Sequence, residues 1–557
     1  MKQKSRFQLV DASEIDPVFN SRSKSLTTEP ISATILTRSY KTDGFDQLSG
    51  KYRIKWEISV MSKNGKSGIT LTRRQFIQAV SAGLAFNGFG NLLQAATEKD
   101  SRPNILLIMA DDLGYHDLGC QGVKDFKTPN IDRLALSGVR FKAGYVTAPQ
   151  CGPSRAGLLT GMHQSRFGCT DNNHDFGLPP KDIVQILPEQ LKSCGYTTGM
   201  IGKWHIGFCE NRQEGHSTRP GHYPWERGFD YVLKHHGGMS HYFPYRKDGR
   251  KWMTKRKREP RLQQKLENEK TPTYQDDLPK DTYLTDIFSD RGADFIKRHK
   301  KDKPWFLFMS YNAPHSPIMA PENKMDKYAH LKNPKRRTLA AMMDSLDDGV
   351  GHVLKTLRET GQAENTLVWF LSDNGGVART SRNWNGSRND PFSGAKGDVF
   401  EGGIRIPFIV SWPGTIPGGK AVSDPVISLD ILLTSMAAAG QEKVADIHDG
   451  KNLLPWLMGK TDCPNDVLFW SWRDRYNAIR KGRLKEIRNA RDVKAVDGTP
   501  IPKHNFVDLE TNPTELAGKQ SLKSSEKREM LSKELDAWLK SIRADAKKLT
   551  PKGNLQQ

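Results

Sequence analysis

The clearest pattern in the chain is a set of short apolar runs, each ending in a cluster of polar residues. Asn104–Ala110 is apolar after its first residue and leads into two aspartates, while Thr366–Leu371 leads into Ser-Asp-Asn-Gly-Gly. Thr197–Ile201 and Pro304–Met309 are followed by similar clusters. A run that is apolar on both faces suits a strand inside a parallel sheet covered by helices.

Helical periodicity appears between these runs, for example over Ile131–Ser137 and Leu339–Leu357. Alternating strands and helices predict an α/β fold with a large mixed or parallel sheet flanked by helices. Each polar cluster lies just beyond the carboxyl end of its strand, where open α/β sheets bind their ligands. We therefore expect the functional site at that edge, within a catalytic domain spanning residues 101–424.

From about Pro425 the pattern changes to shorter elements. Phe469–Trp472, Asn477–Arg480 and Phe506–Leu509 are predicted to be antiparallel strands, and Ser525–Ile542 an amphipathic helix. Residues 425–557 are thus predicted to form a smaller C-terminal α+β subdomain.

The first hundred residues differ from the rest. Residues 1–60 are polar and irregular, and we expect no regular structure there. Over 61–97, the pair Arg73-Arg74, the weakly apolar run Ala79–Leu93 and the small residues that follow are typical of a twin-arginine (Tat) export signal. The alternative is a short buried helix, which its Asn and Gly residues disfavour. Translation starting at Met61 would make residues 1–60 a misassigned extension. The expected location is the periplasm or another exported compartment.

Composition narrows the class of protein. Hydrophobic residues make up 36% of the 557 residues, with 12 Trp and 23 Phe, which argues against global disorder. The formal net charge of +22 indicates either a basic, soluble surface or a polyanionic partner. No nucleic-acid-binding module is recognisable. No other run reaches the ~20 apolar residues of a membrane span, so stable membrane insertion is not expected.

Two smaller features stay open. The polar stretch Lys251–Lys270 contains the basic run Lys255–Arg258, which is either a solvated insertion or a contact for an anionic polymer. The six cysteines include no Cys-x-x-Cys pair, which disfavours a zinc knuckle or a thioredoxin motif but allows a disulfide or two.

Two acidic clusters predict a metal site. Neighbouring side chains on a regular strand point to opposite faces, so Asp111 and Asp112 can converge only where the strand has ended. Asp373 and Asn374 have the same context. Either pair alone is more often a helix cap or a turn. Together they offer oxygen ligands only, which suits Ca²⁺ or Mg²⁺ and not zinc or copper.

Cys151 begins the segment Cys-Gly-Pro-Ser-Arg, in which Gly152 and Pro153 mark the entry into a helix. A helix N-terminus favours negative charge at Cys151, and Arg155 adds to this effect. One interpretation is an activated thiolate. However, a hard cation with oxygen ligands is a poor partner for sulfur, so an oxygen species would fit this position better.

With these motifs, the chain from about residue 103 to 516 resembles the type I, formylglycine-dependent sulfatases of the alkaline-phosphatase-like superfamily. The motifs that carry the resemblance, in chain order, are Pro103–Asp112, Thr128–Asp132, Cys151–Arg155 with Leu159–Gly161, Gly202–His205, Asn312–Pro317, Ser372–Gly375 and Gly394–Gly397. The Cys-x-Pro-Ser-Arg signature of that family is complete.

The resemblance implies that Cys151 is converted to 3-oxoalanine (formylglycine) by a formylglycine-generating enzyme. Its hydrated gem-diol would attack sulfur and also bind one Ca²⁺ per active site. His205 would then take the proton that allows sulfate to leave, for which an unperturbed pKa near 6.5 is suitable. The implied metal ligands are Asp111, Asp112, Cys151, Asp373 and Asn374.

Four further basic residues have implied roles. Arg155 and Lys203 would hold the diol and the sulfate oxygens, while His315 and Lys396 would bind sulfate and stabilise or protonate the leaving oxygen. For a further polar residue near the sulfate, the resemblance leaves the stretch from His235 to Gly238 as the candidate.

The resulting hypothesis is an exported sulfuric ester hydrolase that acts on a sulfated carbohydrate or an aryl sulfate. One alternative is a phosphonate monoester or phosphodiester hydrolase of the same superfamily. The other is a non-catalytic polyanion-binding protein, which would be expected to have a degraded site.

Overall fold

The computed structural model divides the chain into two compact units, residues 1–101 and 102–557. The residues described in the first unit are those of three strands. In the second unit the structure describes residues 102–549 apart from short gaps. The gaps are residues 173–176, 212–214, 236, 245–261, 276–277, 279–281, 300–302, 380, 442–443, 495–498 and 517–525.

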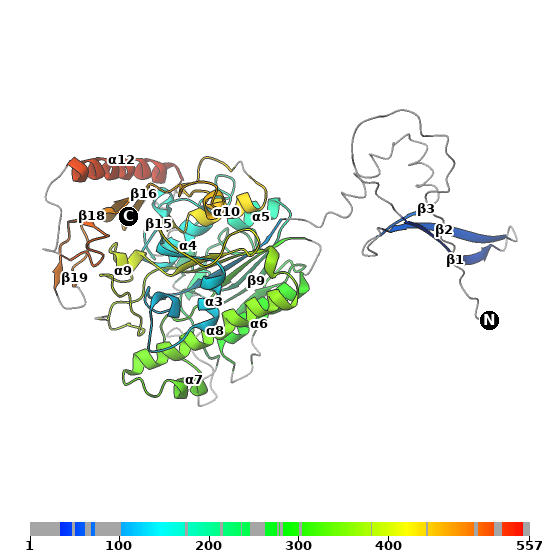
Figure 1. Cartoon of the computed structure of the whole chain (residues 1–557), viewed down its shortest axis with the longest axis horizontal. Helices are drawn as coiled ribbons and strands as arrows, with labels where there is room; N and C mark the ends of the chain where they lie inside the picture. Colours follow the sequence, from blue (N-terminus) through cyan, green and yellow to red (C-terminus); the bar gives the residue numbers. More distant parts are fainter. Residues whose placement is uncertain are drawn as a thin grey trace. The chain divides into compact units, whose positions relative to one another are not determined.

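A ten-stranded mixed sheet forms the centre of the second unit (Figure 1). In spatial order its strands are β11 (Thr273–Gln275), β10 (Leu262–Lys265), β9 (Tyr231–His235), β6 (Thr197–Gly202), β12 (Trp305–Ser310), β4 (Asn104–Ala110), β13 (Thr366–Ser372), β14 (Phe408–Ser411), β5 (Val139–Tyr145) and β15 (Lys420–Ile427). The five strands from β9 to β13 are parallel. The four apolar runs of the sequence all lie among them, which confirms these predicted strands.

Helices cover both faces of this sheet, as Figure 1 shows. On one face lie α3 (Pro129–Ser137), α6 (Leu284–Arg298) and α8 (Pro334–Glu359), and on the other α4 (Cys151–Thr160), α5 (Leu187–Ser193) and α10 (Asp430–Ala438). Alternate residues of β4 enter the two core clusters on either side: Leu107 joins one and Ile108 the other. Burial on both faces explains the unbroken apolar runs and confirms the α/β fold class.

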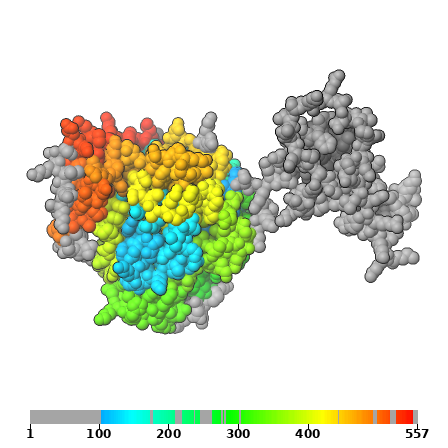
Figure 2. Space-filling model, in the orientation of Figure 1, coloured from blue at the N-terminus to red at the C-terminus, as the bar shows by residue number. Residues whose placement is uncertain are grey.

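A second, antiparallel sheet consists of β16 (Val467–Trp472), β17 (Tyr476–Lys481), β18 (Leu484–Arg488) and β21 (Asn505–Asp508). Helix α12 (Glu526–Leu549) packs Leu531 and Leu535 against Ile479 and Phe506 of this sheet. In Figure 2 these C-terminal residues, in orange and red, form one side of the molecule beside the yellow surface of the preceding segment. The strands predicted at Phe469–Trp472, Asn477–Arg480 and Phe506–Leu509 and the predicted C-terminal helix are confirmed, while the predicted domain boundary at residue 425 falls inside β15.

The first unit contains an antiparallel sheet of β1 (Thr34–Asp46), β2 (Lys51–Met61) and β3 (Gly68–Thr72). Residues 1–60 were expected to lack regular structure, and these strands correct that expectation. The overlooked signal is the alternation of apolar and polar residues from Ile54 to Val60, which is typical of a strand. Most of the predicted export signal, residues 73–97, lies outside the described residues and stays a prediction, as does the start at Met61.

Three smaller points complete the comparison. No helix in the described part of the chain has the length and apolar character needed to cross a bilayer. The five cysteines whose side chains are described form no disulfide. The basic run Lys255–Arg258 lies in a gap, so its role stays open.

Candidate active site

The candidate site lies at the carboxyl edge of the central parallel strands. Backbone hydrogen bonds between neighbouring chain segments continue just past the strands: Asp373 N donates to Ala110 O at 3.1 Å, and Lys203 N to Ser310 O at 2.7 Å. Side chains that follow different strands are thereby brought together. This edge gathers all ten residues predicted from the sequence: Asp111, Asp112, Cys151, Arg155, Lys203, His205, His315, Asp373, Asn374 and Lys396.

A left-handed backbone conformation turns the two aspartates after β4 toward the same site. Asp112 has φ +62°, which is uncommon for a residue with a side chain. Its backbone N–H donates to Asp373 Oδ1 at 3.2 Å. His205, after β6, also has a positive φ, +55°. Strain of this kind costs of order 1–3 kcal/mol and is concentrated at functional sites.

Cys151 is the first residue of α4 and is almost completely buried. The helix starts at Cys151 itself, with Gly152 and Pro153 in its first turn. Cys151 Sγ lies 3.1 Å from His205 Nδ1 and 3.5 Å from Asn172 Nδ2. Asn172 Oδ1 also accepts a hydrogen bond from Gly152 N at 3.0 Å, so this amide holds both the side chain and the backbone of the helix start.

Each of the three carboxylates pairs with a cation from another segment. Lys203 Nζ donates to Asp111 Oδ2 at 2.6 Å, with both side chains fully buried. Arg155 contacts Asp373 Oδ2 through Nε at 2.9 Å and through Nη2 at 2.8 Å.

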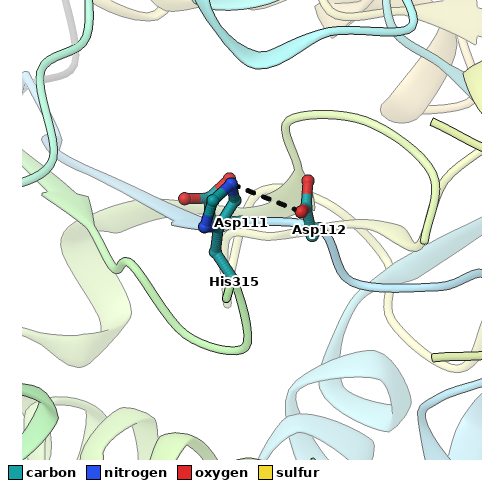
Figure 3. A group of neighbouring side chains, drawn as sticks. All are labelled: Asp111, Asp112 and His315. Carbon is teal, nitrogen blue, oxygen red and sulfur yellow. Dashed lines mark ion pairs between the residues drawn. The ribbon is translucent and has the colours of Figure 1, made fainter. Parts of the chain in front are cut away.

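Asp112 has two basic neighbours, Lys396 and His315. Lys396 Nζ lies 2.6 Å from Asp112 Oδ1, and His315 Nε2 lies 3.5 Å from Asp112 Oδ2. Figure 3 shows the second of these contacts, with Asp111 alongside. Every carboxylate of the site thus already has a positively charged or basic partner.

Burial dominates the electrostatics of the carboxylates. It raises the pKa of Asp111, despite the opposing charge of Lys203. Burial and the neighbouring Asp111 also raise the pKa of Asp373. At Asp112 burial acts in the same direction, but Lys396 and His315 outweigh it and lower the pKa. Closely placed buried carboxylates of this kind favour the addition of positive charge.

The two histidines are neutral in this environment. Burial and the charges of Lys203 and Arg155 lower the pKa of His205 well below its usual range. Burial, together with Lys396, lowers the pKa of His315 to about 4. His315 Nδ1 donates to the carbonyl oxygen of Ser316, so its unprotonated Nε2 faces Asp112. Both rings therefore have one unprotonated nitrogen near pH 7.

The pKa of the Cys151 thiol is lowered, whereas that of an ordinary buried cysteine is raised. Burial alone would raise its pKa, but Lys203 and Lys396 outweigh burial and lower it. By contrast, burial raises the pKa of Cys169 to about 12. Cys151 is thus the cysteine placed for chemistry.

Two oxygen atoms provide a test of whether the site fits a cation. Asp111 Oδ1 and Asn374 Oδ1 are buried and have no hydrogen-bond partner. The Asn374 amide nitrogen donates to Asp112 Oδ1 at 2.8 Å and Gly375 O at 2.9 Å, so its oxygen is left for another partner. Two clusters of candidate ligand atoms, each spanning less than 4.8 Å, share Asp111: one adds Asp112 and His315, the other Cys151 and Asp373. The carboxylate and amide oxygens among these donors fit a hard divalent cation such as Ca²⁺, whereas the Cys151 sulfur does not.

Sequence reasoning missed two residues that hold this arrangement. Asn172 lies in a loop without a recognisable motif. Ser310 ends β12, and its hydroxyl donates to Lys203 O at 2.6 Å while accepting from Arg155 Nη1 at 2.5 Å. Its position at a strand end was the available signal.

The candidate stretch from His235, the last residue of β9, to Gly238 reaches the site only in part. The His235 ring packs against Phe288 in the core cluster that also contains α6 and α8, and His236 lies outside the described residues. Gly238 contacts the site directly, because a Cβ placed there would come within 2.4 Å of His205 Nε2.

Asp398 is a buried carboxyl in the loop that carries Lys396. Its Oδ2 accepts from Ala395 N at 3.0 Å, and burial raises its pKa to about 7 despite Arg491 at 4.0 Å. A carboxyl whose pKa is raised on folding contributes stability that is full below its unfolded value of 3.8 and is lost as the pH rises through about 7.

Asp398→Asn is therefore expected to flatten the decrease in unfolding free energy between pH 4 and pH 8, as measured by urea denaturation. Asp462→Asn, at an exposed position, is the matched control and should keep the wild-type slope. Equal slopes in wild type and Asp398→Asn would contradict this prediction.

Comparison with known proteins agrees with the geometry. The family model described as Sulfatase matches residues 103–441, which is more than half of the chain. The chain belongs to the sulfatase family. This sulfatase is 33% identical to human N-acetylgalactosamine-6-sulfatase over 413 residues, covering 68% of this chain and 74% of the relative. It is a sulfuric ester hydrolase.

Two solved structures place the fold. A structure described as Ps i-CgsB in complex with k-i-k-neocarrahexaose has a TM-score of 0.64 and 32% identity, covering 79% of this sulfatase and 93% of that chain. The phosphonate monoester hydrolase of Agrobacterium radiobacter has a TM-score of 0.54 and 20% identity, covering 80% and 96%. The second likeness concerns the fold alone.

Proposed function

We propose that this sulfatase hydrolyses sulfate esters of sulfated carbohydrates, using 3-oxoalanine formed from Cys151 and one bound Ca²⁺. The observation that carries the proposal is the position of Cys151, at a helix start and 3.1 Å from the neutral His205. The positive charges of Lys203 and Lys396 lower the pKa of the side chain at this position. A sulfate group entering there would meet fixed positive charge in a site shielded from water.

Four residues would hold the cation: Asp111, Asp112, Asp373 and Asn374. Their support is the pair of partnerless buried oxygens, on Asp111 and Asn374, and the closeness of the carboxylate oxygens of Asp112 and Asp373 to Asp111. When bound, Ca²⁺ would polarise the sulfate oxygens and offset the repulsion among the carboxylates.

The side chains near Cys151 divide the remaining work. His205 Nδ1 lies beside the atom that is bonded to the Cys151 Cβ. It would take a proton from that atom and return it in a later step. The ammonium group of Lys203, which pairs with Asp111, would balance negative charge in the site. Arg155 is already engaged with Asp373, Ser310 and the Lys203 carbonyl, so we assign it to positioning rather than to sulfate contact.

Lys396 and His315 face the site from the side of Asp112. Asp112 outweighs burial and raises the pKa of Lys396, so this ammonium stays charged and would bind a sulfate oxygen. His315 Nε2 would lie near the bridging oxygen, where it would assist departure of the alcohol. Binding and charge compensation are thus supplied by groups that are fixed before substrate enters.

The carbohydrate substrate is supported by the relatives. One is named for a sulfate ester of N-acetylgalactosamine, and one structure was solved with a neocarrahexaose. The net charge of +22 is consistent with polyanionic substrates.

Comparing 4-nitrophenyl sulfate with a 4-nitrophenyl phosphonate monoester tests the reaction class. We expect kcat/KM to favour the sulfate at least about 10-fold, a difference of about 1.4 kcal/mol. A large preference for the phosphonate would instead support the alternative hydrolase. No turnover of either ester, together with tight binding of sulfated polysaccharide, would favour the non-catalytic alternative.

Export through the Tat machinery to the periplasm, and modification by a formylglycine-generating enzyme, are part of this proposal. The first rests on Arg73-Arg74 and the apolar run that follows, the second on the Cys151–Arg155 signature. Because the Tat route carries folded proteins, modification and metal loading would be completed before export. Finding only unmodified thiol in the cytoplasmic precursor by intact mass would contradict this order, and residues before Met61 in that precursor would contradict the proposed start.

A further inference from the structure

The C-terminal sheet carries three exposed arginines at the end nearest the active site. Arg473 and Arg475 belong to the turn between β16 and β17, and Arg491 follows β18. We call these three residues the arginine cluster. Beneath them the rings of Trp472 and Tyr476 stack with centroids 5.2 Å apart.

Contacts to three separate catalytic segments place the cluster at the active site. Trp472 Nε1 donates to Gln150 Oε1 at 3.1 Å, one residue before Cys151. Arg491 Nη1 donates to Gly397 O at 3.4 Å, one residue after Lys396.

The third contact is to the loop that carries Asn172, the residue that holds Cys151. Arg473 Nε pairs with Asp171 Oδ2 at 3.2 Å, one residue before Asn172, and Arg473 N donates to Thr170 O at 3.2 Å. The arginine cluster therefore adjoins three loops of the site, although it is more than 300 residues from Cys151 in sequence.

The aromatic rings orient the guanidinium groups. Arg473 lies 4.9 Å and Arg491 5.9 Å from the Trp472 ring centroid, and Arg475 lies 5.6 Å from that of Tyr476. Trp472 is itself buried, so it supports these arginines and does not offer a face to solvent. Cation–π contacts of this kind reduce the mobility of a long side chain and leave its outer N–H groups to bind other anions.

Local acidic groups compensate this charge only in part. Asp171 pairs with the Nε of Arg473, and Asp398 lies 4.0 Å from Arg491. Asp474 in the same turn interacts with Arg543 of α12 as well as with Asp171.

Further charged residues lie near the arginine cluster. Asp492 pairs with Lys503 at 3.1 Å. A cavity of about 840 Å³ lies between β17, β18 and α12, and its lining includes Arg543, which interacts with Asp474 of the turn. The basic residues that line it are Arg488, Lys540, Arg543, Lys547 and Lys548.

The backbone of the turn is also held in an unusual conformation. Arg473 has φ +53° and Asp474 φ +51°, so two consecutive residues with side chains lie in the left-handed region. Glycine would adopt this conformation without strain. An arginine at position 473 therefore costs backbone strain, which is explained if the function of its side chain requires it there.

We propose that the arginine cluster binds a second anionic group, a sulfate ester or a carboxylate, on the oligosaccharide whose sulfate enters the catalytic site. The planar guanidinium fork matches the spacing of oxygens in both groups. The substrate class is thus an oligosaccharide with negative charges on neighbouring sugars. This inference rests on the proposed sulfatase activity and extends it to substrate selection.

The test compares variants on two kinds of substrate. Arg473→Ala and Arg491→Ala are measured on 4-nitrophenyl sulfate and on two oligosaccharides, a chondroitin 6-sulfate tetrasaccharide and an iota-carrageenan hexasaccharide. Arg483→Ala is the matched control, because Arg483 is an exposed arginine at the opposite end of the same sheet. All proteins are used as the modified, calcium-loaded full chain.

We expect each cluster variant to lower the ratio of kcat/KM for the oligosaccharide to kcat/KM for the aryl sulfate at least about 10-fold, mainly through KM. Arg483→Ala should leave both values within about twofold, as surface substitutions usually do. Added salt should weaken oligosaccharide turnover more in the wild type than in the variants.

Other outcomes separate the possible failures. Equal losses of kcat/KM on both kinds of substrate would mean that the arginines only support the catalytic loops. Wild-type kcat/KM on both kinds of substrate would mean that they bind nothing, and either result overturns the inference. If the wild type hydrolyses the aryl sulfate but neither of the two oligosaccharides, the inference is also overturned. If wild type hydrolyses no sulfate ester at all, the proposed function itself fails.

Discussion

Replacing Cys151 with alanine is expected to lower kcat for sulfate ester hydrolysis by at least about 10⁴-fold, while the protein stays folded. The reason is that removal of the nucleophile leaves only binding and charge stabilisation. The side chain removed is small, and Gly152 N keeps its hydrogen bond to Asn172. Steady-state kinetics with 4-nitrophenyl sulfate and a thermal unfolding curve measure the two effects.

Cys169→Ala provides the matched control. Cys169 is also buried and unpaired, but burial raises its pKa to about 12 and it is not part of the site. Its replacement should change kcat by no more than a few fold. Wild-type protein isolated without the modification should behave like Cys151→Ala. Full activity in a sample whose Cys151 peptide has the mass of an unmodified thiol would contradict the proposed nucleophile.

The sequence predicted the catalytic edge because each strand there is buried on both sides. A strand such as β4 has no solvent-facing residues, so its apolar run is continuous and the change to Asp111 is abrupt. The same contrast marks the end of β13 before Asp373. Local pattern therefore sufficed to place the residues that follow these strands.

The remaining residues depend on contacts between distant segments. Asn172 touches Cys151 because its loop meets the start of α4, and no local pattern marks it. The predicted boundary at residue 425 falls inside β15 because that strand is half exposed and resembles the short strands that follow. The strands of residues 34–61 were overlooked because the polar composition there outweighed an alternating pattern.

A buried ion network links the C-terminal sheet to the catalytic edge. Lys485 Nζ contacts Glu401 Oε1 and Glu515 Oε1, each at 2.8 Å, and all three side chains are fully buried. Glu401 begins α9 (Glu401–Ile404), and Gly375 N donates to Gly403 O at 3.0 Å. Since a Cβ at Gly375 would lie 1.9 Å from Gly402 O, the turn that carries Asn374 rests directly on this helix.

Lys485→Met is expected to lower the free energy of unfolding by about 3–5 kcal/mol, because it leaves two buried carboxyls without their shared cation. Urea denaturation at pH 8 measures this loss. Lys533→Met removes an exposed lysine paired with Glu529 and should cost no more than about 1 kcal/mol. Similar stabilities for the two variants would show that Lys485 does not hold the sheets together.

The pH dependence distinguishes lost charge compensation from lost packing. In the wild type, Lys485 outweighs burial and lowers the pKa of Glu401 to about 2, while burial raises that of Glu515 to about 7. Without Lys485 both carboxyls should bind protons more readily in the folded state, so the variant loses stability as the pH rises. The destabilisation should therefore be smaller at pH 5 than at pH 8. Because α9 supports the turn before Asn374, a variant that still folds at pH 5 should also require more Ca²⁺ for half-maximal activity, and equal requirements would separate the network from the catalytic site.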